Sequence, residues 1–478
     1  MRNAIQPQSL WRETAVAAPA ARPLSGTFRA DIAIIGGGYT GLSAALRATE
    51  RGLKPAVLEA GEVGFGASGR NGGVVSPKYR VSLADMARAH GLDLAHLMNR
   101  LAHDAMDSVE RYVAECRIDR AGFAKVGNLR CAHNKVALDR LVSETETASR
   151  MFGDESLRIL DAQEMWAETG SRDFVGGVLN AHAGVIHPLN YVRGLAAAVR
   201  ERGGEIFEQS AVTTIHRRPN SVELRTEHGA VVAGKLLMAT NGYSDLTSAT
   251  AAVRKAVIPF RSAMVATEPL TPEMFSVLIP SGRSYSETRR MMRWFRRIDD
   301  RLLFGGRGAF GRSDSAAAFA ALEGEMKRIF PQIADRRVTH RWSGLVAMTL
   351  DSLPQIGLLD SRTAFSVGYN GAGIAMASLL GRHAIDLLLG EETDLGLMRR
   401  AKPQPIPFYG LRKPVVRIVA GVVRAPGPDR SVETDGVIAR CKSASHRGLR
   451  SGCCGWKPHR QSGATRTRPR ASGAAAPR

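Results

Sequence analysis

The amino-acid sequence predicts a mixed α/β protein, with one domain organised around a parallel sheet and a second domain that contains a β-sheet. Residues 31–36 form an apolar, β-branched run, residues 39–52 have helix-forming composition, and residues 55–60 return to strand character. Near the other end of the chain, residues 365–389 repeat the order of strand, glycine turn and helix, and residues 257–306 between them are rich in strand patterns. We therefore expect the parallel-sheet domain to be assembled from discontinuous segments.

The remaining elements and the length complete this division. Residues 82–117 and 134–150 have apolar spacing that fits helices, and residues 293–306 are typical of a hairpin that turns at Asp299 and Asp300. A chain of 478 residues fits two domains plus appendages. The predicted first domain comprises residues 28–85, 155–255 and 340–400, the second comprises residues 86–154 and 256–339, and residues 1–27 form an N-terminal arm.

The charge is concentrated near the carboxyl end. Residues 425–478 hold eleven Lys or Arg and three acidic residues, so they contribute +8 to the formal net charge of +21. This stretch is rich in Gly, Ser, Pro and Arg and lacks apolar periodicity, which predicts a disordered basic tail. A solvated tail explains the charge more simply than a nucleic-acid-binding arm does.

Composition also restricts the compartment and rules against several kinds of site. No uninterrupted apolar run reaches the roughly 18 residues of a membrane-spanning helix, and the amino terminus makes a poor secretory signal. The five cysteines are scattered without the spacing of metal ligands, so no metal site and no disulfide framework is expected. These observations predict a cytoplasmic protein.

Three glycines lie where the first predicted strand meets the first predicted helix. Gly36, Gly38 and Gly41 form G-x-G-x-x-G, and Glu59 ends the next strand. In this context the glycines allow a tight turn, close approach of a pyrophosphate and close helix–strand packing, while the acid accepts hydrogen bonds from a ribose. An isolated motif of this kind often marks only a turn, but the flanking strands and Glu59 favour a Rossmann-like dinucleotide site. An acid in place of an arginine disfavours NADP.

The loop after Glu59 distinguishes between the remaining dinucleotides. GEVGFGASGRNGG, residues 61–73, offers several backbone N–H donors to a pyrophosphate and to the polar edge of a flavin. With this loop, the sequence resembles the D-amino-acid-oxidase-type (DAO) superfamily of FAD-dependent oxidoreductases, and within it the gamma-glutamylputrescine oxidase type. The resemblance covers residues 8–410, and four further segments carry it in the family's order: HPLNYVRGLAAAVRERGGEIFEQSAVTTI, KLLMATNGYS, RWSGLVAMTLDSLPQIG and VGYNGAGIA.

The resemblance implies which residues contact FAD and which border the reacting centre. Tyr369 could equally be core packing, Trp342 could be a buried structural residue, and His187 in the same region is better explained as a structural histidine. The implied cofactor contacts are Gly36, Gly38, Tyr39, Thr40, Gly41, Glu59, Ala60, Ser68, Gly69, Arg70, Asn71, Gly72, Val212, Asn241, Gly242, Gly371, Ala372, Gly373 and Ile374. The candidate catalytic residues are Arg70, Asn71, Trp342, Tyr369 and Asn370.

The implied chemistry is oxidation of a C–N bond, in which hydride passes to the flavin and water hydrolyses the resulting imine. Relatives that oxidise amino acids bind the substrate carboxylate with two arginines, whose positions here correspond to Val346 and Gly371. This departure predicts an amine without an α-carboxylate, such as an N-acylated polyamine or another secondary amine. Some relatives attach FAD through a cysteine near residues 342–357, and that stretch has none, so non-covalent FAD is expected.

Several alternatives stay open at this point. The first is an FAD-dependent oxidase or dehydrogenase of glycine, sarcosine or a D-amino acid. The second is a flavin-containing RNA-modifying or nucleic-acid-binding protein, and the third is a flavin-bearing subunit that only passes electrons. Spacing does not distinguish oxygen from an electron carrier as the acceptor.

Overall fold

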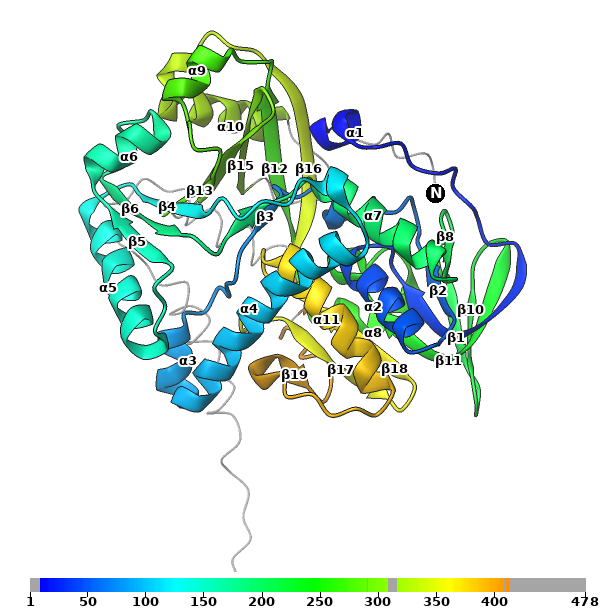
Figure 1. Cartoon of the computed structure of the whole chain (residues 1–478). Coiled ribbons are helices and arrows are strands. Elements are labelled where there is room, and N and C mark those ends of the chain that lie inside the picture. The colour runs from blue at the N-terminus through cyan, green and yellow to red at the C-terminus, as the bar shows by residue number, and fades with distance from the viewer. Residues whose placement is uncertain (1–8, 290, 308–315, 408, 412–478) are drawn as a thin grey trace, which may run out of the picture. The chain divides into compact units, whose positions relative to one another are not determined.

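The structure is a computed structural model that describes residues 9–289, 291–307, 316–407 and 409–411. The described residues belong to one compact unit that contains both large sheets (Figure 1). The predicted disordered tail, residues 425–478, lies outside the described residues. The helices are α1 (Leu10–Thr14), α2 (Tyr39–Glu50), α3 (Leu83–His90), α4 (Leu92–Glu115), α5 (Lys135–Phe152), α6 (Ala162–Thr169), α7 (Pro188–Glu201), α8 (Ala251–Arg254), α9 (Pro272–Val277), α10 (Ala316–Ile329) and α11 (Gly373–Leu388).

The first sheet has nine strands and contains the predicted β-α-β unit. β1 pairs in parallel with β2 on one side and with β11 on the other. β10 and β9 extend from β11 as an antiparallel ribbon. The strand order is β19 (Arg399–Arg400), β17 (Gln355–Asp360), β18 (Thr363–Val367), β11 (Gly229–Met238), β1 (Gly26–Ile35), β2 (Pro55–Leu58) and β8 (Glu205–Phe207), with β10 (Val222–Arg225) and β9 (Thr214–Arg217) off this path.

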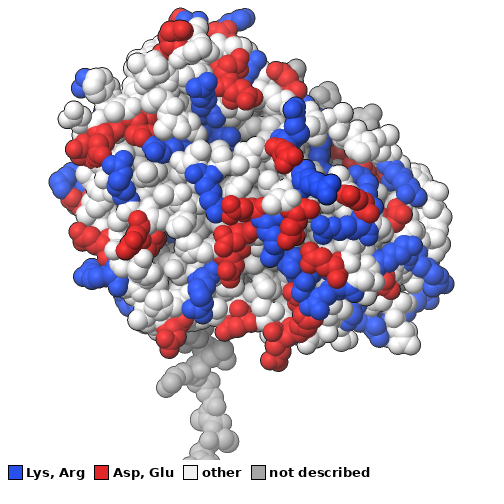
Figure 2. All heavy atoms as spheres, in the orientation of Figure 1, with Lys and Arg blue, Asp and Glu red and all other residues white. Residues whose placement is uncertain are grey.

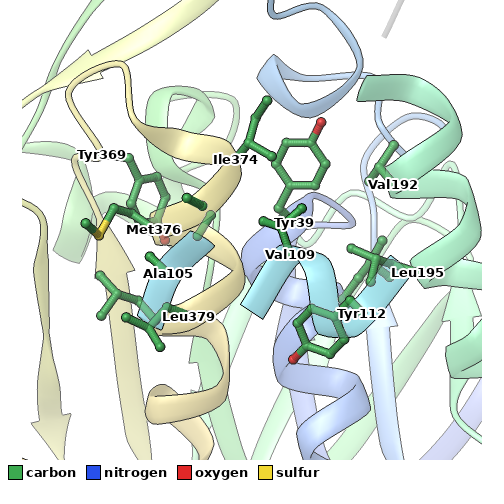
Figure 3. Close-up of a cluster of buried hydrophobic side chains, with 14 of the residues drawn as sticks. Tyr39, Ala105, Val109, Tyr112, Val192, Leu195, Tyr369, Ile374, Met376 and Leu379 are labelled. Atoms are coloured by element: carbon green, nitrogen blue, oxygen red, sulfur yellow. The ribbon is translucent and has the colours of Figure 1, made fainter. Parts of the chain in front are cut away.

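Alternating side chains of β1 belong to two different cores. Ile32 and Ile34 pack with α2, α4, α7 and α11, whereas Ala33 and Ile35 pack with β10, β11 and the segment around α8. This alternation follows from the two-residue period of a strand that is buried on both faces. Figure 3 shows the helical core, whose labelled residues are Tyr39, Ala105, Val109, Tyr112, Val192, Leu195, Tyr369, Ile374, Met376 and Leu379.

The second sheet has eight strands and a core of its own. Phe295, Phe304 and Tyr285 stack beneath α10, whose residues Phe319 and Leu322 complete this core. The strand order is β16 (Val338–Met348), β12 (Ile258–Thr267), β15 (Arg301–Arg307), β14 (Arg293–Ile298), β13 (Ser284–Glu287), β4 (Asn128–Ala132), β6 (Gly176–Asn180) and β5 (Leu157–Leu160), and a separate pair consists of β3 (Val74–Val75) and β7 (Gly184–Val185).

The local predictions and the predicted domain boundaries fare differently. The hairpin turns where expected, since Ile298 pairs with Arg301 and Asp299 has a φ of +49°. Three strands that lie wholly or mostly in the predicted first domain, β5, β6 and β16, belong to the eight-stranded sheet instead. Moreover α4, which was assigned to the second domain, packs on α2 and α11. Its long apolar face requires that partner, and sequence order does not reveal it.

Among the described residues, no helix is both long and apolar enough to cross a membrane. The cytoplasmic localisation stays a prediction.

Candidate functional site

The turn between β1 and α2 has the geometry that the three glycines predict. Gly36 has a φ of +114°, and a Cβ there would lie 2.9 Å from the Ala239 carbonyl oxygen. A Cβ at Gly41 would lie 1.9 Å from the Gly36 carbonyl oxygen, so only glycine allows α2 to start this close to the turn. A Cβ at Gly38 would meet Ser68 Oγ at 2.8 Å, which places the following loop against this cradle.

Two helices begin side by side next to this turn. The N-cap of α2, Gly38, and the N-cap of α11, Ala372, form no side-chain cap, and neither helix has an acidic residue in its first turn. Thr40 Oγ1 and Tyr369 OH are 2.6 Å apart, which joins the two helix beginnings. The first-turn N–H groups and the aligned dipoles both favour negative charge here, so the site suits the phosphates of a dinucleotide.

Glu59 is fixed by backbone donors on both sides. Its Oε2 accepts a hydrogen bond from Gly37 N at 2.7 Å, and its Oε1 accepts one from Gly61 N at 2.9 Å. Burial raises the pKa of this carboxyl, while the hydrogen bonds from Gly61 and Gly37 oppose that rise. The carboxylate is therefore held in place at the end of β2, where sugar hydroxyls of a dinucleotide would donate to it.

Glu59→Gln should weaken FAD binding and should remove the loss of FAD affinity that the wild-type protein shows at acidic pH. Ribose hydroxyls donate to the ionised carboxylate, so we expect wild-type affinity to fall as pH decreases through the raised pKa of Glu59. Loss of the charge-assisted bonds should weaken binding at neutral pH by about 10- to 100-fold. Fluorescence titration of the apoprotein across pH measures both effects. Glu110→Gln on the exposed surface of α4 is the control, and an unchanged pH profile in Glu59→Gln would contradict the assignment.

The loop that was predicted to face the flavin is held mainly by Tyr39 and Asn71. Tyr39 OH donates to Ser68 O at 2.6 Å, and Tyr39 N donates to Ser68 Oγ at 3.1 Å. Asn71 Nδ2 donates to Ala67 O and Ser68 O, and Asn71 Oδ1 accepts from Gly73 N. The side chain of Asn71 is thus occupied inside the loop. Its predicted role at the reacting centre stays a prediction, and the structure adds a loop-bracing role for the side chain.

Arg70 extends from the same loop toward β16. Its guanidinium carbon lies 4.7 Å from the centre of the Phe65 ring, and its Nη1 donates to Ser343 O at 3.4 Å. The long Ser343 bond and the ring contact leave the cation partly exposed. Its predicted contact with the flavin or substrate stays a prediction that this position permits.

Asn370 and Tyr369, at the carboxyl-terminal loop, are used within the protein. Tyr369 is buried, and its hydroxyl also lies 2.9 Å from Ser366 Oγ. Asn370 Oδ1 accepts from Thr349 N at 3.0 Å, and its Nδ2 donates to Thr349 Oγ1 at 3.0 Å. These contacts favour core packing for Tyr369 and a brace between β16 and α11 for Asn370, while the catalytic roles expected for both stay predictions.

Trp342 is buried beside the loop that contains Arg70. Its side chain is 0% exposed, and its Nε1 donates to Arg70 O at 3.1 Å. A fully buried indole offers no surface to a substrate. The structure therefore favours a core position for Trp342 over a position in the wall of the substrate pocket.

His187 caps α7 as a neutral histidine. Its Nδ1 accepts from Asn190 N at 3.1 Å, and its Nε2 lies 3.0 Å from Thr14 Oγ1. Burial lowers the pKa of His187 to about 4. The ring therefore serves as a helix cap, as the sequence indicated.

The other predicted cofactor residues differ in how the structure uses them. Asn241 Oδ1 accepts from Gly368 N at 2.8 Å, so it holds the loop before α11, and the buried Val212 packs in the core on the second face of the first sheet. Gly371 has a φ of +99°, and no atom would lie within 4 Å of a Cβ there. The rest lie at the turn and loops described above or next to them: Ala60, Gly69, Gly72, Gly242, Gly373 and Ile374.

Sequence reasoning missed three contributors. Gly37 supplies an N–H to Glu59 and was recognisable only as the middle glycine of a triplet. Trp11 and Arg296 both contact the flavin-side loop, through Asn71 O and Gly73 O respectively. The fully buried Trp11 lies in the predicted N-terminal arm, and its one signal in the sequence is a tryptophan two residues after a serine that caps a helix.

Comparison with known proteins agrees with this geometry. The model of the family described as FAD dependent oxidoreductase matches residues 31–387. The chain is 32% identical over 404 residues to the probable oxidoreductase OrdL of Haemophilus influenzae, which covers 82% of this chain and 88% of that protein. It is 32% identical over 390 residues to gamma-glutamylputrescine oxidoreductase of Escherichia coli, covering 80% and 89% of the two chains.

A solved structure has the same fold. The crystal structure of glycine oxidase from Geobacillus kaustophilus superposes with a TM-score of 0.66 at 21% identity, covering 77% of this chain and 96% of that one. The residues that form the cradle, the helix beginnings and the fixed carboxylate fit a flavin dinucleotide, and most of the chain matches the family. The chain therefore belongs to the DAO-type family of FAD-dependent oxidoreductases.

Proposed function

We propose that this enzyme oxidises the C–N bond of an amine that has no carboxylate on the reacting carbon, such as an N-acylated polyamine. When bound, FAD supplies the acceptor for the hydride that leaves the carbon next to nitrogen. The chain's own residues hold the dinucleotide at Gly36–Gly41 and Glu59 and form the surface that receives the amine.

One observation carries the choice of substrate. Val346 stands where the resemblance implies a carboxylate-binding arginine, is partly exposed, and lies opposite the partly exposed Phe260 of β12. Gly371, at the other such position, has no side chain to offer. An apolar surface lowers the pKa of a bound amine by disfavouring the ammonium form, and the neutral amine is the form that can be oxidised. The gamma-glutamylputrescine oxidoreductase of Escherichia coli, whose name indicates an acylated diamine, supports the same class.

An anaerobic panel of amines tests this proposal. We expect N-acylated diamines and secondary amines without an α-carboxylate to bleach the flavin absorbance at least about tenfold faster than glycine, sarcosine or D-alanine. A missing arginine contact to a buried carboxylate is worth 1.5–3 kcal/mol, which corresponds to about 10- to 100-fold. Faster reduction by glycine, sarcosine or D-alanine would overturn the proposal. Admission of air after reduction then shows whether oxygen or a separate carrier reoxidises the flavin.

Two arginines near Val346 keep amino-acid oxidation as a second candidate. Arg261 Nη1 donates to Ser343 Oγ at 2.5 Å, and Arg70 Nη1 donates to Ser343 O, so both cations approach the same point on β16. On the first proposal they suit a carboxylate remote from the reacting nitrogen; on the second they bind the α-carboxylate itself. Arg261→Met distinguishes these cases, because only on the second should it reduce turnover of glycine more than turnover of simple amines.

We further propose that FAD is bound without a covalent link. The segment from Trp342 to Gly357 contains no cysteine, and the free cysteines that the structure describes are Cys116, in the turn that ends α4, and Cys131, buried in β4. Acid precipitation of the holoprotein should therefore leave the yellow colour in the supernatant. Colour that stays in the pellet would show a covalent attachment.

The face of the molecule that Figure 2 shows favours a small-molecule enzyme over a nucleic-acid-binding protein. On the face shown in Figure 2, Lys and Arg alternate with Asp and Glu. Several of these arginines are paired, for example Arg328 with Asp173 at 2.8 Å. Nucleic-acid recognition typically requires a patch of one sign, so this mixed face supports the amine oxidoreductase reading.

A further inference from the structure

The N-terminal arm forms a capped helix and is held against the rest of the protein by three polar contacts, to His187, Asn190 and His340. Ser9 caps α1 by accepting from Arg12 N at 3.3 Å, and Thr14 Oγ1 lies 3.0 Å from His187 Nε2. Val16 N donates to Asn190 Oδ1 at 2.9 Å. Glu13 Oε2 lies 2.8 Å from His340 Nε2, which adds a contact with β16. So many specific contacts over eight residues are more than a solvated leader needs.

Trp11 occupies the centre of this segment. Its side chain is 0% exposed, its ring meets His187 edge-on at 4.9 Å, and Trp342 packs against it at 6.3 Å. Its Nε1 donates to the Asn71 carbonyl oxygen at 2.8 Å. A buried indole N–H needs an acceptor, and here the acceptor is the backbone of the flavin-side loop.

Two other distant residues grip neighbouring carbonyls of the same loop. Trp342 Nε1 donates to Arg70 O at 3.1 Å, and Arg296 Nη1 donates to Gly73 O at 2.7 Å and to Ile186 O at 3.1 Å. Arg296 is buried, and its guanidinium carbon lies 6.0 Å from the Trp11 ring. Among the described residues, no carboxylate forms an ion pair with it, so its hydrogen-bonding capacity is directed at backbone carbonyls.

These three donors determine where the N–H groups of the loop point. In a planar trans peptide the carbonyl and the following N–H point in opposite directions. Because the carbonyls of Arg70 and Asn71 point toward the two indoles, the N–H groups of Asn71 and Gly72 point away from them. Within the described part of the chain, neither N–H has an acceptor, and both residues are partly exposed. They are donors without a protein partner, in the loop that should meet the flavin.

We infer that Trp11 is a positioning residue for the flavin: together with Trp342 and Arg296 it clamps the carbonyls of residues 70, 71 and 73 and thereby presents the N–H groups of Asn71 and Gly72 to the cofactor. The inference rests on FAD binding at this loop but not on the choice of amine. The N-terminal arm then completes the cofactor site from outside both sheets.

Trp11→Phe tests the inference, because phenylalanine keeps an aromatic ring in the core and removes the N–H donor. We expect the FAD dissociation constant to rise about 5- to 10-fold, as for one lost hydrogen bond of the usual strength, and the visible absorption bands of the bound flavin to shift. Trp166→Phe, at a largely exposed tryptophan of α6, is the matched control and should leave both unchanged.

Arg296→Lys is a second variant that retains the positive charge and hydrogen-bond donors but loses the planar guanidinium, and it should produce a smaller change in the same two quantities. Flavin spectra and affinities equal to wild type in a folded Trp11→Phe protein would overturn the inference. A lower unfolding temperature without either flavin change would also overturn it, because Trp11 would then only be packing. Neither readout uses amine turnover, so failure of the substrate proposal is seen separately in the amine panel.

Discussion

Gly41→Ala is expected to weaken FAD binding by at least about 100-fold, which corresponds to about 2.7 kcal/mol. The added methyl group would lie 1.9 Å from the Gly36 carbonyl oxygen and 3.2 Å from Ile34 Cγ2, both in or next to β1. Relief requires α2 to move away from the strand, and overpacking of this kind costs about 1–3 kcal/mol or more in stability. The same movement displaces the first-turn N–H groups from the phosphates. Fluorescence titration and thermal unfolding measure the two losses.

Gly324→Ala is the matched control and should have the opposite sign. Gly324 lies in α10, is exposed, and has no atom within 4 Å of where its Cβ would be. Alanine in an exposed helix interior should stabilise the protein by about 0.5–1 kcal/mol and leave the flavin affinity unchanged. Equal effects of the two substitutions would mean that the glycine requirement at position 41 has been misread.

Trp342→Ala is expected to destabilise the protein by about 3–5 kcal/mol, as large core truncations do. The indole is fully buried in the helical core, next to the ring of Trp11. Its removal also leaves the Arg70 carbonyl oxygen without its hydrogen-bond donor. We expect a lower midpoint of urea unfolding together with weaker FAD binding.

Trp166→Ala separates burial from residue type. Trp166 is 48% exposed, with the Arg172 guanidinium 4.6 Å from its ring centre, and its truncation should change stability by only about 0.5 kcal/mol. A Trp342→Ala protein with wild-type stability and flavin affinity but impaired amine turnover would instead restore Trp342 as a wall of the substrate pocket.

Local determinants explain which parts of the site could be predicted. The strand, turn and helix around Gly36 and Gly41 and the acid at Glu59 depend on neighbours within thirty residues, so their chemistry is visible in order along the chain. For Asn71, Tyr369 and Asn370 the sequence did not reveal the contacts within the protein that the structure shows. Amide and phenol groups suit a ligand and a protein partner equally, and here their partners are Ala67, Ser366 and Thr349.

The domain boundaries illustrate the same limit on a larger scale. The pattern of α4 predicts an amphipathic helix correctly, but a helical stripe does not specify which sheet it will cover. The same holds for β5 and β6, whose short apolar runs would fit either sheet, and their pairing with β4 is set by register along strands distant in sequence.

By itself the sequence determined the dinucleotide cradle, the class of cofactor through its resemblance, and the absence of arginine at Val346 and Gly371. Only the tertiary structure decided that the arm carrying Trp11 belongs to the site and that the Arg296 guanidinium donates to the Gly73 carbonyl oxygen. The physical reason is distance along the chain. A glycine at a turn is constrained by its own backbone, whereas a buried donor is constrained by a carbonyl that folding brings from 60 or 223 residues away.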